Sequence, residues 1–319
     1  MTNTLNRAAV AFPLNWQHCR PYRAYERAER LGPYYVRWDA DGGPYGEGWA
    51  GERFDAQGVL ISGKERAYHP IRIAQFALEQ FGRWRERGDV AARRAFLAQS
   101  RWFLEHQHVR RNIPGCYPFP FAWPRYGAPA GFLSAMAQGE AISVLLRAAQ
   151  TTQSDIYLHA AVRAAQPFRH AIGEGGVSWT APRGDLIFEE AATQNAAHIL
   201  NGWIFAAWGL FELRSYASWA GDLFDRSMET LLERLPLYDS GRWSYYSLAM
   251  ERGGFRRLAT LKYHAFHVAQ LHVLASMTGH TAFEDTACRW QSYTRRIDSR
   301  AALWSNSCRA ALREKSGAE

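Results

Sequence analysis

The feature that most constrains the fold of this chain is a helical period that begins near Pro70 and then recurs in pairs. From that residue onward apolar side chains return at intervals of three and four, the spacing of one face of an α-helix. The helical segments fall into pairs joined by short polar turns such as QTTQSD and TGHTAFED. We therefore predict a mainly α protein. The expected helices span residues 70–87, 91–108, 134–151, 154–171, 193–214, 219–235, 260–279 and 281–298, with a further helix over 301–313.

Long connectors rich in Gly, Pro and aromatic residues separate the pairs, at 112–133, 172–192 and 237–259. The pairs recur roughly every 60 residues, which is too long and irregular for the common solenoids with units of about 33 to 47 residues. Short turns at one end and long connectors at the other predict helical hairpins arranged in an incomplete (α/α) barrel, or toroid. The long loops should gather at one end, where a rigid scaffold can position functional residues.

The segment 34–61 has a different pattern. Its alternating stretches YYVRW and GVLIS flank the turn-like DADGGPYGEG, so a small N-terminal β-hairpin region is expected. No linker or charge run divides the rest of the chain. We predict an N-terminal segment with short strands over 1–64 and one α/α-barrel domain over 65–319.

The longest apolar run, 203–211, is too short to cross a bilayer, and the first 20 residues lack the features of a signal peptide. We therefore expect a cytoplasmic protein without a membrane span. The four cysteines, Cys19, Cys116, Cys288 and Cys308, match no zinc or CxxC spacing and are expected to be reduced, mostly buried thiols.

The charge balance indicates an anionic partner. Lys and Arg number 38 against 30 Asp and Glu, a net charge of +8. Most Arg residues lie singly on helical patterns and no nucleic-acid recognition motif is present, so nucleic acid is not expected. An acidic polysaccharide is the other anionic polymer that this charge would favour.

Paired carboxylates are the first candidate for chemistry. Glu189 and Glu190 stand directly before the helix expected to begin near Thr193. They could simply complement the dipole of that helix. Alternatively, one of them lies at the loop end of the toroid and exchanges a proton with bound substrate.

A second candidate is a segment crowded with tyrosine, arginine and histidine around the last long connector. A tyrosine hydroxyl titrates near 10, so it acts as a base only where cations and hydrogen bonds favour the phenolate. The same residues could be ordinary packing residues with satisfied polar ends. The spacing of the histidines is unconvincing for a metal, and none is predicted. The residues are Tyr245, Tyr246, Arg252, Arg256, Arg257, Lys262, Tyr263, His264, His267 and His272.

The first long connector, RNIPGCYPFPFAWPRYGAPAGF, carries Arg125 and Tyr126 near its end. Stacking rings with hydrogen-bonding cations suit a flat sugar ring that carries a carboxylate, although loop packing explains them equally well. Ser-His-Asp, Cys-His, P-loop and GxGxxG patterns find no convincing match.

Several of these segments resemble one family. The run GFLSAMAQGEAISVLLRAAQTTQSDIYLHAAVRAAQPF, GGV at 175–177, and LPLYDSGRWSYYSL followed by KYHAFHVAQL are similar to the core signature of the D-glucuronyl C5-epimerases of heparan-type polysaccharides. YHPIRIAQFALEQF resembles the first barrel helix of that family and FEEAATQNAAHILNGW its central one. The resemblance is collinear over about 34–298. The membrane anchor and the longer N-terminal β region of the animal enzymes, where a calcium site has been described, have no counterpart of sufficient length, so no calcium is expected.

The resemblance implies an incomplete α/α barrel, often a homodimer, that converts glucuronic acid to iduronic acid within a heparosan-like polysaccharide by inverting C5 without a cofactor. It implies catalytic roles for Glu190 and Tyr263. Tyr246 matches a further functional tyrosine, with a one-residue ambiguity caused by Tyr245. The chain departs from the family pattern at two functional positions, which hold Ala191 and Ala249.

Our hypothesis is therefore a uronosyl C5-epimerase acting on an anionic uronic-acid polysaccharide. Glu190 and Tyr263 are the opposed acid and base, and Tyr246 assists. The expected substrate-binding residues are Arg125, Tyr126, Glu189, Tyr245, Arg256 and His264. A uronate polysaccharide lyase and a non-catalytic glycan-binding relative remain alternatives; an inverting glycosidase is less favoured because its two carboxylates must flank the bond.

Overall fold

The computed structural model of this chain describes residues 31–36, 49, 52–251 and 254–296. The helix expected over 301–313, the turn DADGGPYGEG, Arg252, Cys19 and Cys308 lie outside these residues, as does part of the YYVRW stretch.

The described part of the chain is mainly helical, as predicted. Its α-helices form hairpins of consecutive pairs, and half of the helices begin at a residue whose side chain caps a free N–H group. The Asp89 carboxylate accepts from Ala92 N at 3.0 Å and the Ser134 hydroxyl from Ala137 N at 3.3 Å. The helices are α1 (Pro70–Arg87), α2 (Val90–Glu105), α3 (Ala135–Thr152), α4 (Asp155–Ala164), α5 (Leu200–Leu213), α6 (Ser218–Arg234), α7 (Leu261–Thr278) and α8 (Thr281–Tyr293).

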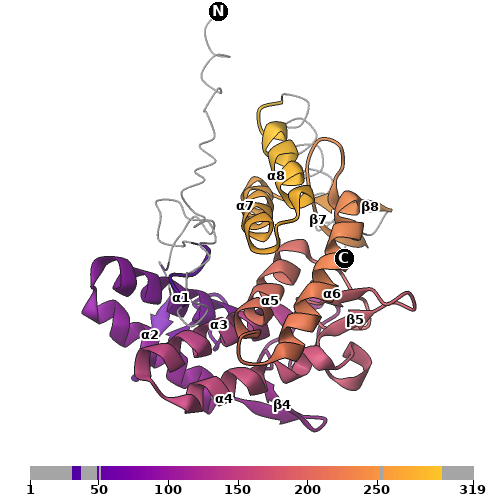
Figure 1. Ribbon diagram of the computed structural model, residues 1–319. Coiled ribbons are helices and arrows are strands. Elements are labelled where there is room, and N and C mark those ends of the chain that lie inside the picture. Colours follow the sequence, from indigo (N-terminus) through magenta and orange to yellow (C-terminus); the bar gives the residue numbers. More distant parts are fainter. Residues whose placement is uncertain (1–30, 37–48, 50–51, 252–253, 297–319) are drawn as a thin grey trace, which may run out of the picture.

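The hairpins are arranged as an open α/α toroid (Figure 1). The first helix of each hairpin forms an inner row, in which α1 packs on α3, α3 on α5 and α5 on α7. The second helix of each hairpin packs mainly on its own partner and forms the outer layer. All inner helices consequently run in the same direction, and their N-terminal ends lie on one side of the ring.

The centre of the molecule is the crossing of α3 and α5. A Cβ on Gly209 would lie 2.3 Å from the carbonyl oxygen of Gly139, so only glycine permits this approach. All residues of α5 are buried. Across the same interface the guanidinium of Arg147 forms a bidentate pair with the carboxylate of Glu212, at 2.7 and 2.8 Å.

The long connectors contain β-hairpins that the sequence analysis did not predict. Strands β3 (His108–Arg110) and β4 (Ile113–Cys116) follow the first pair of helices, and β5 (Ser178–Thr180) and β6 (Leu186–Phe188) follow the second. Strands β7 (Tyr245–Glu251) and β8 (Phe255–Leu258) precede α7. Each pair is antiparallel and short, and it fixes the residues that follow it against the ends of the inner helices.

The predicted start of the helix at Thr193 is wrong, because α5 begins at Leu200. The carboxylate of Glu189 accepts hydrogen bonds from the backbone N–H groups of Ala197 and His198, at 3.2 and 3.1 Å. These bonds hold the chain in an irregular loop, and His198 adopts a positive φ of 50°. The helix predicted over 154–171 also ends early, at Ala164, where it gives way to short 3₁₀ turns.

At the N-terminal side the GVLIS stretch forms strand β2 (Leu60–Ile61), but its partner is β1 (Arg53–Phe54), which lies outside the YYVRW stretch from which the hairpin was expected. Gln99 of α2 ties this hairpin to the helices, because its side chain accepts from Leu60 N at 3.0 Å and donates to Gly58 O at 2.7 Å. The division of the chain at residue 64 stays a prediction.

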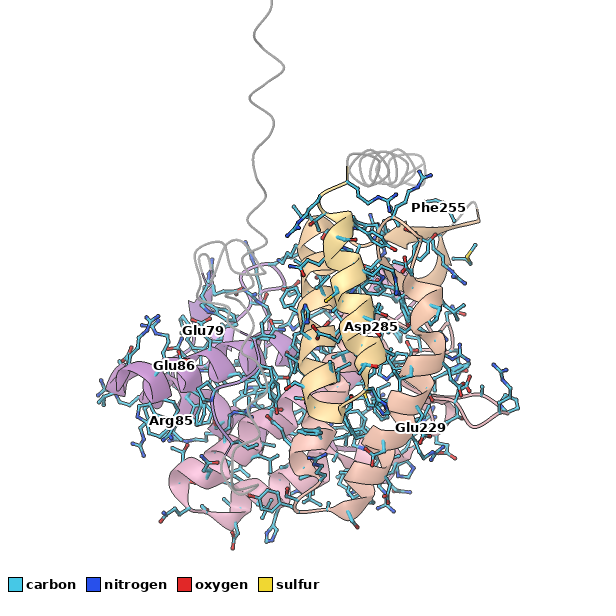
Figure 2. All side chains as sticks on the ribbon, turned by 45° about the horizontal axis from the view of Figure 1, so that its top comes forward. Glu79, Arg85, Glu86, Glu229, Phe255 and Asp285 are labelled. Carbon is cyan, nitrogen blue, oxygen red and sulfur yellow. The ribbon has the colours of Figure 1, made fainter. Side chains whose placement is uncertain are left out.

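Charged side chains lie on the solvent-facing surface of the helices. Glu229 of α6 and Asp285 of α8 are exposed on the outer layer, and Arg85 and Glu86 are exposed at the C-terminal end of α1 (Figure 2). Among the described ranges, no helix is both long and apolar enough to cross a membrane. Of the two cysteines described, Cys116 is buried and Cys288 is exposed, and neither is in a disulfide.

Candidate functional site

A cavity of about 550 Å³ lies at the N-terminal ends of the inner helices. Each inner helix contributes residues from its first turns, and the connectors supply the remaining walls. The lining residues are Lys64, Glu65, His69, Ile71, Arg72, Gln75, Phe119, Phe121, Ala122, Trp123, Pro124, Phe132, Met136, Glu190, Asn201, Tyr246 and Tyr263. Glu190, Tyr246 and Tyr263, three of the residues expected from the sequence, therefore meet in one cavity.

Backbone hydrogen bonds of the preceding residue hold Glu190 in place. Glu189, its neighbour, donates its N–H to Val177 O at 2.9 Å, and the carbonyl of Glu189 accepts from Ala135 N at the start of α3, also at 2.9 Å. The carboxyl of Glu190 lies against Gly202 in the first turn of α5. A Cβ on Gly202 would lie 2.1 Å from Glu190 Oε2, so this glycine makes the space that the carboxyl occupies.

The carboxyl of Glu190 is poised to exchange a proton near neutral pH. Its side chain is 6% exposed, and its Oε2 has no hydrogen-bond partner among the described residues. Burial, and secondly the charge of Glu189, raise the pKa of Glu190 to about 8. A carboxyl with such a pKa is a candidate acid or base.

Glu189 has a different role from its neighbour. It is fully buried, and its carboxylate binds the backbone N–H groups described above as well as Nδ1 of His198. Glu189 therefore builds the loop before α5 and does not line the cavity. Its expected role as a substrate-binding residue is not supported by this placement.

Tyr263 and Tyr246 form a second part of the site. Their rings meet edge to face, with centroids 4.8 Å apart. Burial and the charge of Glu190 raise the pKa of Tyr263 to about 12, while a hydrogen bond with Tyr246 acts in the other direction. At neutral pH Tyr263 therefore carries its proton and is suited to donate it.

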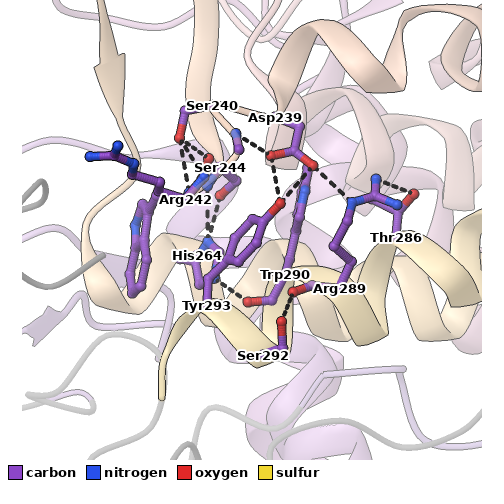
Figure 3. Close-up of polar contacts among 12 residues, drawn as sticks. Asp239, Ser240, Arg242, Ser244, His264, Thr286, Arg289, Trp290, Ser292 and Tyr293 are labelled. Atoms are coloured by element: carbon purple, nitrogen blue, oxygen red, sulfur yellow. Dashed lines mark hydrogen bonds and ion pairs between the residues drawn. The ribbon is translucent and has the colours of Figure 1, made fainter. Parts of the chain in front are cut away.

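A buried polar cluster joins the chain just before Tyr246 to the helix that carries Tyr263, and Figure 3 shows Ser244, His264 and Trp290 of this cluster. The hydroxyl of Ser244, two residues before Tyr246, lies 2.8 Å from Nδ1 of His264 and 2.9 Å from Nδ1 of His267. The ring of His264 stacks on Trp243 at 3.8 Å, and its Nε2 lies 3.0 Å from Trp290 O. Both nitrogens of His264 are thus engaged inside the protein.

His264, an expected substrate-binding residue, is fully buried and anchors the helix that carries Tyr263, and it does not line the cavity. Burial lowers the pKa of this histidine to about 4, so it is neutral at neutral pH.

The other expected binding residues lie near the cavity but do not line it. Arg125 pairs with Glu251 at 2.6 Å, and the ring of Tyr126 packs edge-on against Trp123 at 4.5 Å. Burial, and secondly the charge of Glu190, raise the pKa of Tyr126, which places that hydroxyl in the neighbourhood of the carboxyl.

Strand β7 distinguishes the adjacent tyrosines. Tyr246 lines the cavity, whereas Tyr245 lies outside it, with the Arg256 guanidinium 5.9 Å from the centre of its ring. Arg256 also donates to Leu237 O at 3.2 Å. Neither Ala191 nor Ala249 is among the lining residues, and Ala191 is fully buried.

The sequence analysis did not nominate the cavity wall that is formed by the start of α1 and the loop before it. His69, the N-cap of α1, packs against Phe119 and Phe121, with ring centroids 5.1 and 5.3 Å away. Lys64 and Glu65 reach the same cavity from the loop that precedes α1. The available signal was the position of HP directly before the helical period, which is typical of a helix start.

The arrangement of the inner helices gives the cavity a positive electrostatic potential. The N-terminal ends of α1, α3, α5 and α7 converge on it, and each carries the partial positive charge of a helix dipole. Such a site favours bound or developing negative charge. Within the described residues, no group of three or more His, Cys, Asp or Glu side chains could hold a metal ion.

Fold and site together define an α/α toroid with titratable groups of raised pKa in a partly aromatic cavity at the loop end of its ring. The chain belongs to the D-glucuronyl C5-epimerase family: residues 114–292 match the family model described as "D-glucuronyl C5-epimerase C-terminus".

Curated relatives agree with this membership. A D-glucuronyl C5-epimerase of Caenorhabditis elegans is 31% identical over 214 residues, which is 62% of this chain and 35% of that protein. An uncharacterized protein of Methanocaldococcus jannaschii is 26% identical over 178 residues, 54% of this chain and 56% of that protein. The chain thus spans about a third of one relative and just over half of the other. Among solved structures, the unsaturated glucuronyl hydrolase of Bacillus sp. GL1 matches with a TM-score of 0.47 and 14% identity, covering 70% of this chain and 61% of that one.

Proposed function

We propose that this protein is a cofactor-independent C5-epimerase that converts glucuronic acid to iduronic acid residues within a heparosan-like polysaccharide. The observation that carries the proposal is the meeting of Glu190, Tyr246 and Tyr263 in one cavity, although they come from distant parts of the chain. Family membership supports the reaction type.

The two raised pKa values and the shared cavity support distinct proton-transfer roles for Glu190 and Tyr263. The ionised carboxylate of Glu190, with its pKa of about 8, removes the proton from C5 on one face of the sugar ring. The hydroxyl of Tyr263, with its pKa of about 12, keeps its proton and delivers it to the opposite face. The configuration at C5 is thereby inverted. Glu190 and Tyr263 then return to their starting states by exchanging protons with water.

Loss of the C5 proton leaves negative charge that spreads onto the uronate carboxylate. Stabilising this charge is expected to be the largest electrostatic contribution to the rate. The converging N-termini of the inner helices supply fixed positive potential at the cavity. The aromatic rings in the walls lower the local dielectric, which strengthens that interaction.

Incubation with heparosan in deuterated water tests the reaction and its rivals together. An epimerase yields iduronic acid that carries deuterium at C5 in an uncleaved polymer, detected by NMR and mass spectrometry. A lyase instead expels the C4 substituent and produces the ultraviolet absorbance of an unsaturated uronate. Binding without isotope exchange would show a non-catalytic relative, the outcome that Ala191 and Ala249 would then explain.

A further inference from the structure

The loop before α1 is fixed rigidly over the cavity. Ser62 and Ala67 close it as an isolated β-bridge, with Ser62 N donating to Ala67 O at 3.0 Å. Within the loop Arg66 N donates to Ser62 O at 2.8 Å. Gly63 N donates to the carboxylate of Glu52 at 2.7 Å, and the same carboxylate pairs with Arg72 in the first turn of α1. The position of Lys64 in this loop is therefore set by α1.

The two cationic residues on this wall of the cavity differ in whether they form an ion pair. Lys64 and Arg72 are the cationic residues that line the cavity. Arg72 is paired with Glu52 through its Nε at 3.0 Å and also stacks on Trp49 at 4.6 Å. Lys64 is exposed and forms no ion pair with any acidic side chain of the described residues, and the carboxylate of its neighbour Glu65 is engaged by the hydroxyl of Ser62.

The histidine beside Lys64 adds no charge. His69 accepts the N–H of Arg72 on its Nδ1 at 3.5 Å, and burial lowers the pKa of His69 to about 4. It is therefore neutral at neutral pH, and Lys64 is the cationic residue of this wall that no ion pair with a described residue holds.

We propose that Lys64 binds the carboxylate of the uronic acid residue whose C5 faces Glu190 and Tyr263. This proposal rests on the proposed function and identifies the group that selects acidic over neutral sugars. A bound uronate and an ionised Glu190 bring two negative charges into an aromatic-walled space, and Lys64 offsets one of them. A lysine suits this role because its flexible stem carries a compact charge with three donors.

Binding to heparosan by titration calorimetry tests the proposal with matched variants of the full chain. Lys64→Gln should weaken binding about tenfold, the loss expected for one charge-assisted hydrogen bond. Lys64→Arg keeps the charge and should restore most of the affinity. Arg66→Gln removes the same charge from an exposed position in the same loop that does not line the cavity, and it should leave binding unchanged.

A carboxyl-reduced heparosan separates recognition of the carboxylate from a general effect of charge or folding. The wild-type protein should bind the reduced polymer weakly, and Lys64→Gln should make no further difference to it. Equal binding of unmodified heparosan by the wild-type protein and Lys64→Gln would overturn the Lys64 proposal and leave the proposed reaction standing. Binding that depends on Lys64, without deuterium exchange at C5, would overturn the reaction and leave the carboxylate site. No binding of heparosan to the wild-type protein would overturn both.

Discussion

At the residue scale, the most unusual side chain is a second buried carboxyl behind the cavity. Glu140 in α3 is fully buried; its Oε1 accepts from Gln75 at 3.2 Å, and its Oε2 has no hydrogen-bond partner among the described residues. Burial, and then the charge of Glu190, hold the pKa of Glu140 well above its ordinary value of 4.5. Glu140 is therefore a neutral carboxylic acid when exposed carboxyls are ionised.

This raised pKa predicts a pH-dependent stability cost. Below about pH 4.5 folded and unfolded chains both hold the proton, so Glu140 has no effect. Between about pH 4.5 and the raised pKa of Glu140 in the folded chain, only the folded chain keeps this proton. In that range the free energy of unfolding falls by about 1.4 kcal/mol per pH unit. Glu140→Gln should remove this slope, so its stability relative to wild type rises with pH in denaturant unfolding. The exposed Glu229→Gln is the control; a pH-independent difference for Glu140→Gln would show that Glu140 ionises in the fold.

The pKa of Glu190 predicts the pH dependence of exchange. Because the carboxylate is the reactive form, kcat/KM for deuterium incorporation at C5 should rise about tenfold per pH unit below pH 8 and level off above it. A rate that instead falls as the pH rises through 8 would mean that protonated Glu190 is the reactive form. The profile is measured at substrate concentrations below KM, where it reports the free protein.

At the element scale, the close crossing of α3 and α5 sets the geometry of the inner row. Gly209→Ala would force a Cβ to within 2.3 Å of Gly139 O, so the helices must separate. We expect a loss of about 1–3 kcal/mol in the free energy of unfolding. The control is Gly221→Ala in α6, where a Cβ would lie 3.4 Å from that of Arg214 and alanine is the better helix former. Equal effects of the two substitutions would contradict the tight crossing.

The cluster around Ser244 connects two elements of the site, β7 and α7. Ser244→Ala removes the hydroxyl that both histidine rings contact and should cost about 1–3 kcal/mol of stability. It should also slow exchange at C5, because Tyr246 and Tyr263 are held by the strand and helix that this hydroxyl joins. Ser292→Ala, whose hydroxyl only donates to Arg289 O on α8, should do neither. Normal exchange by a destabilised Ser244→Ala would separate this cluster from the site.

The elements also show what sequence could and could not predict. Helices such as α1 and α3 were predictable because their period and their caps are local signals. The start of α5 was not, because the carboxylate of Glu189 captures backbone N–H groups eight and nine residues further along the chain. The hairpins in the connectors were missed because most of their strands have only three or four residues, too few to show an alternating pattern, and β4 also contains Pro and Gly.

At the scale of the whole molecule, the toroid brings segments that are distant in the sequence together at one site. Glu190, Tyr246 and Tyr263 were nominated by resemblance, and the toroid accounts for their meeting, since consecutive hairpins return the chain to the same end (Figure 1). Lys64 carries no motif, and its place at the cavity depends on the packing of its loop against α1. The sequence alone therefore could not indicate the role that we propose for Lys64.

The opposed action of Glu190 and Tyr263 is the central claim, and the stereochemistry of deuterium incorporation at C5 of heparosan tests it most directly. Glu190→Gln should abolish both exchange and inversion. Tyr263→Phe should abolish formation of iduronic acid while Glu190 still exchanges the C5 proton with retained configuration. Deuterated iduronic acid formed by Tyr263→Phe at the wild-type rate would contradict the account.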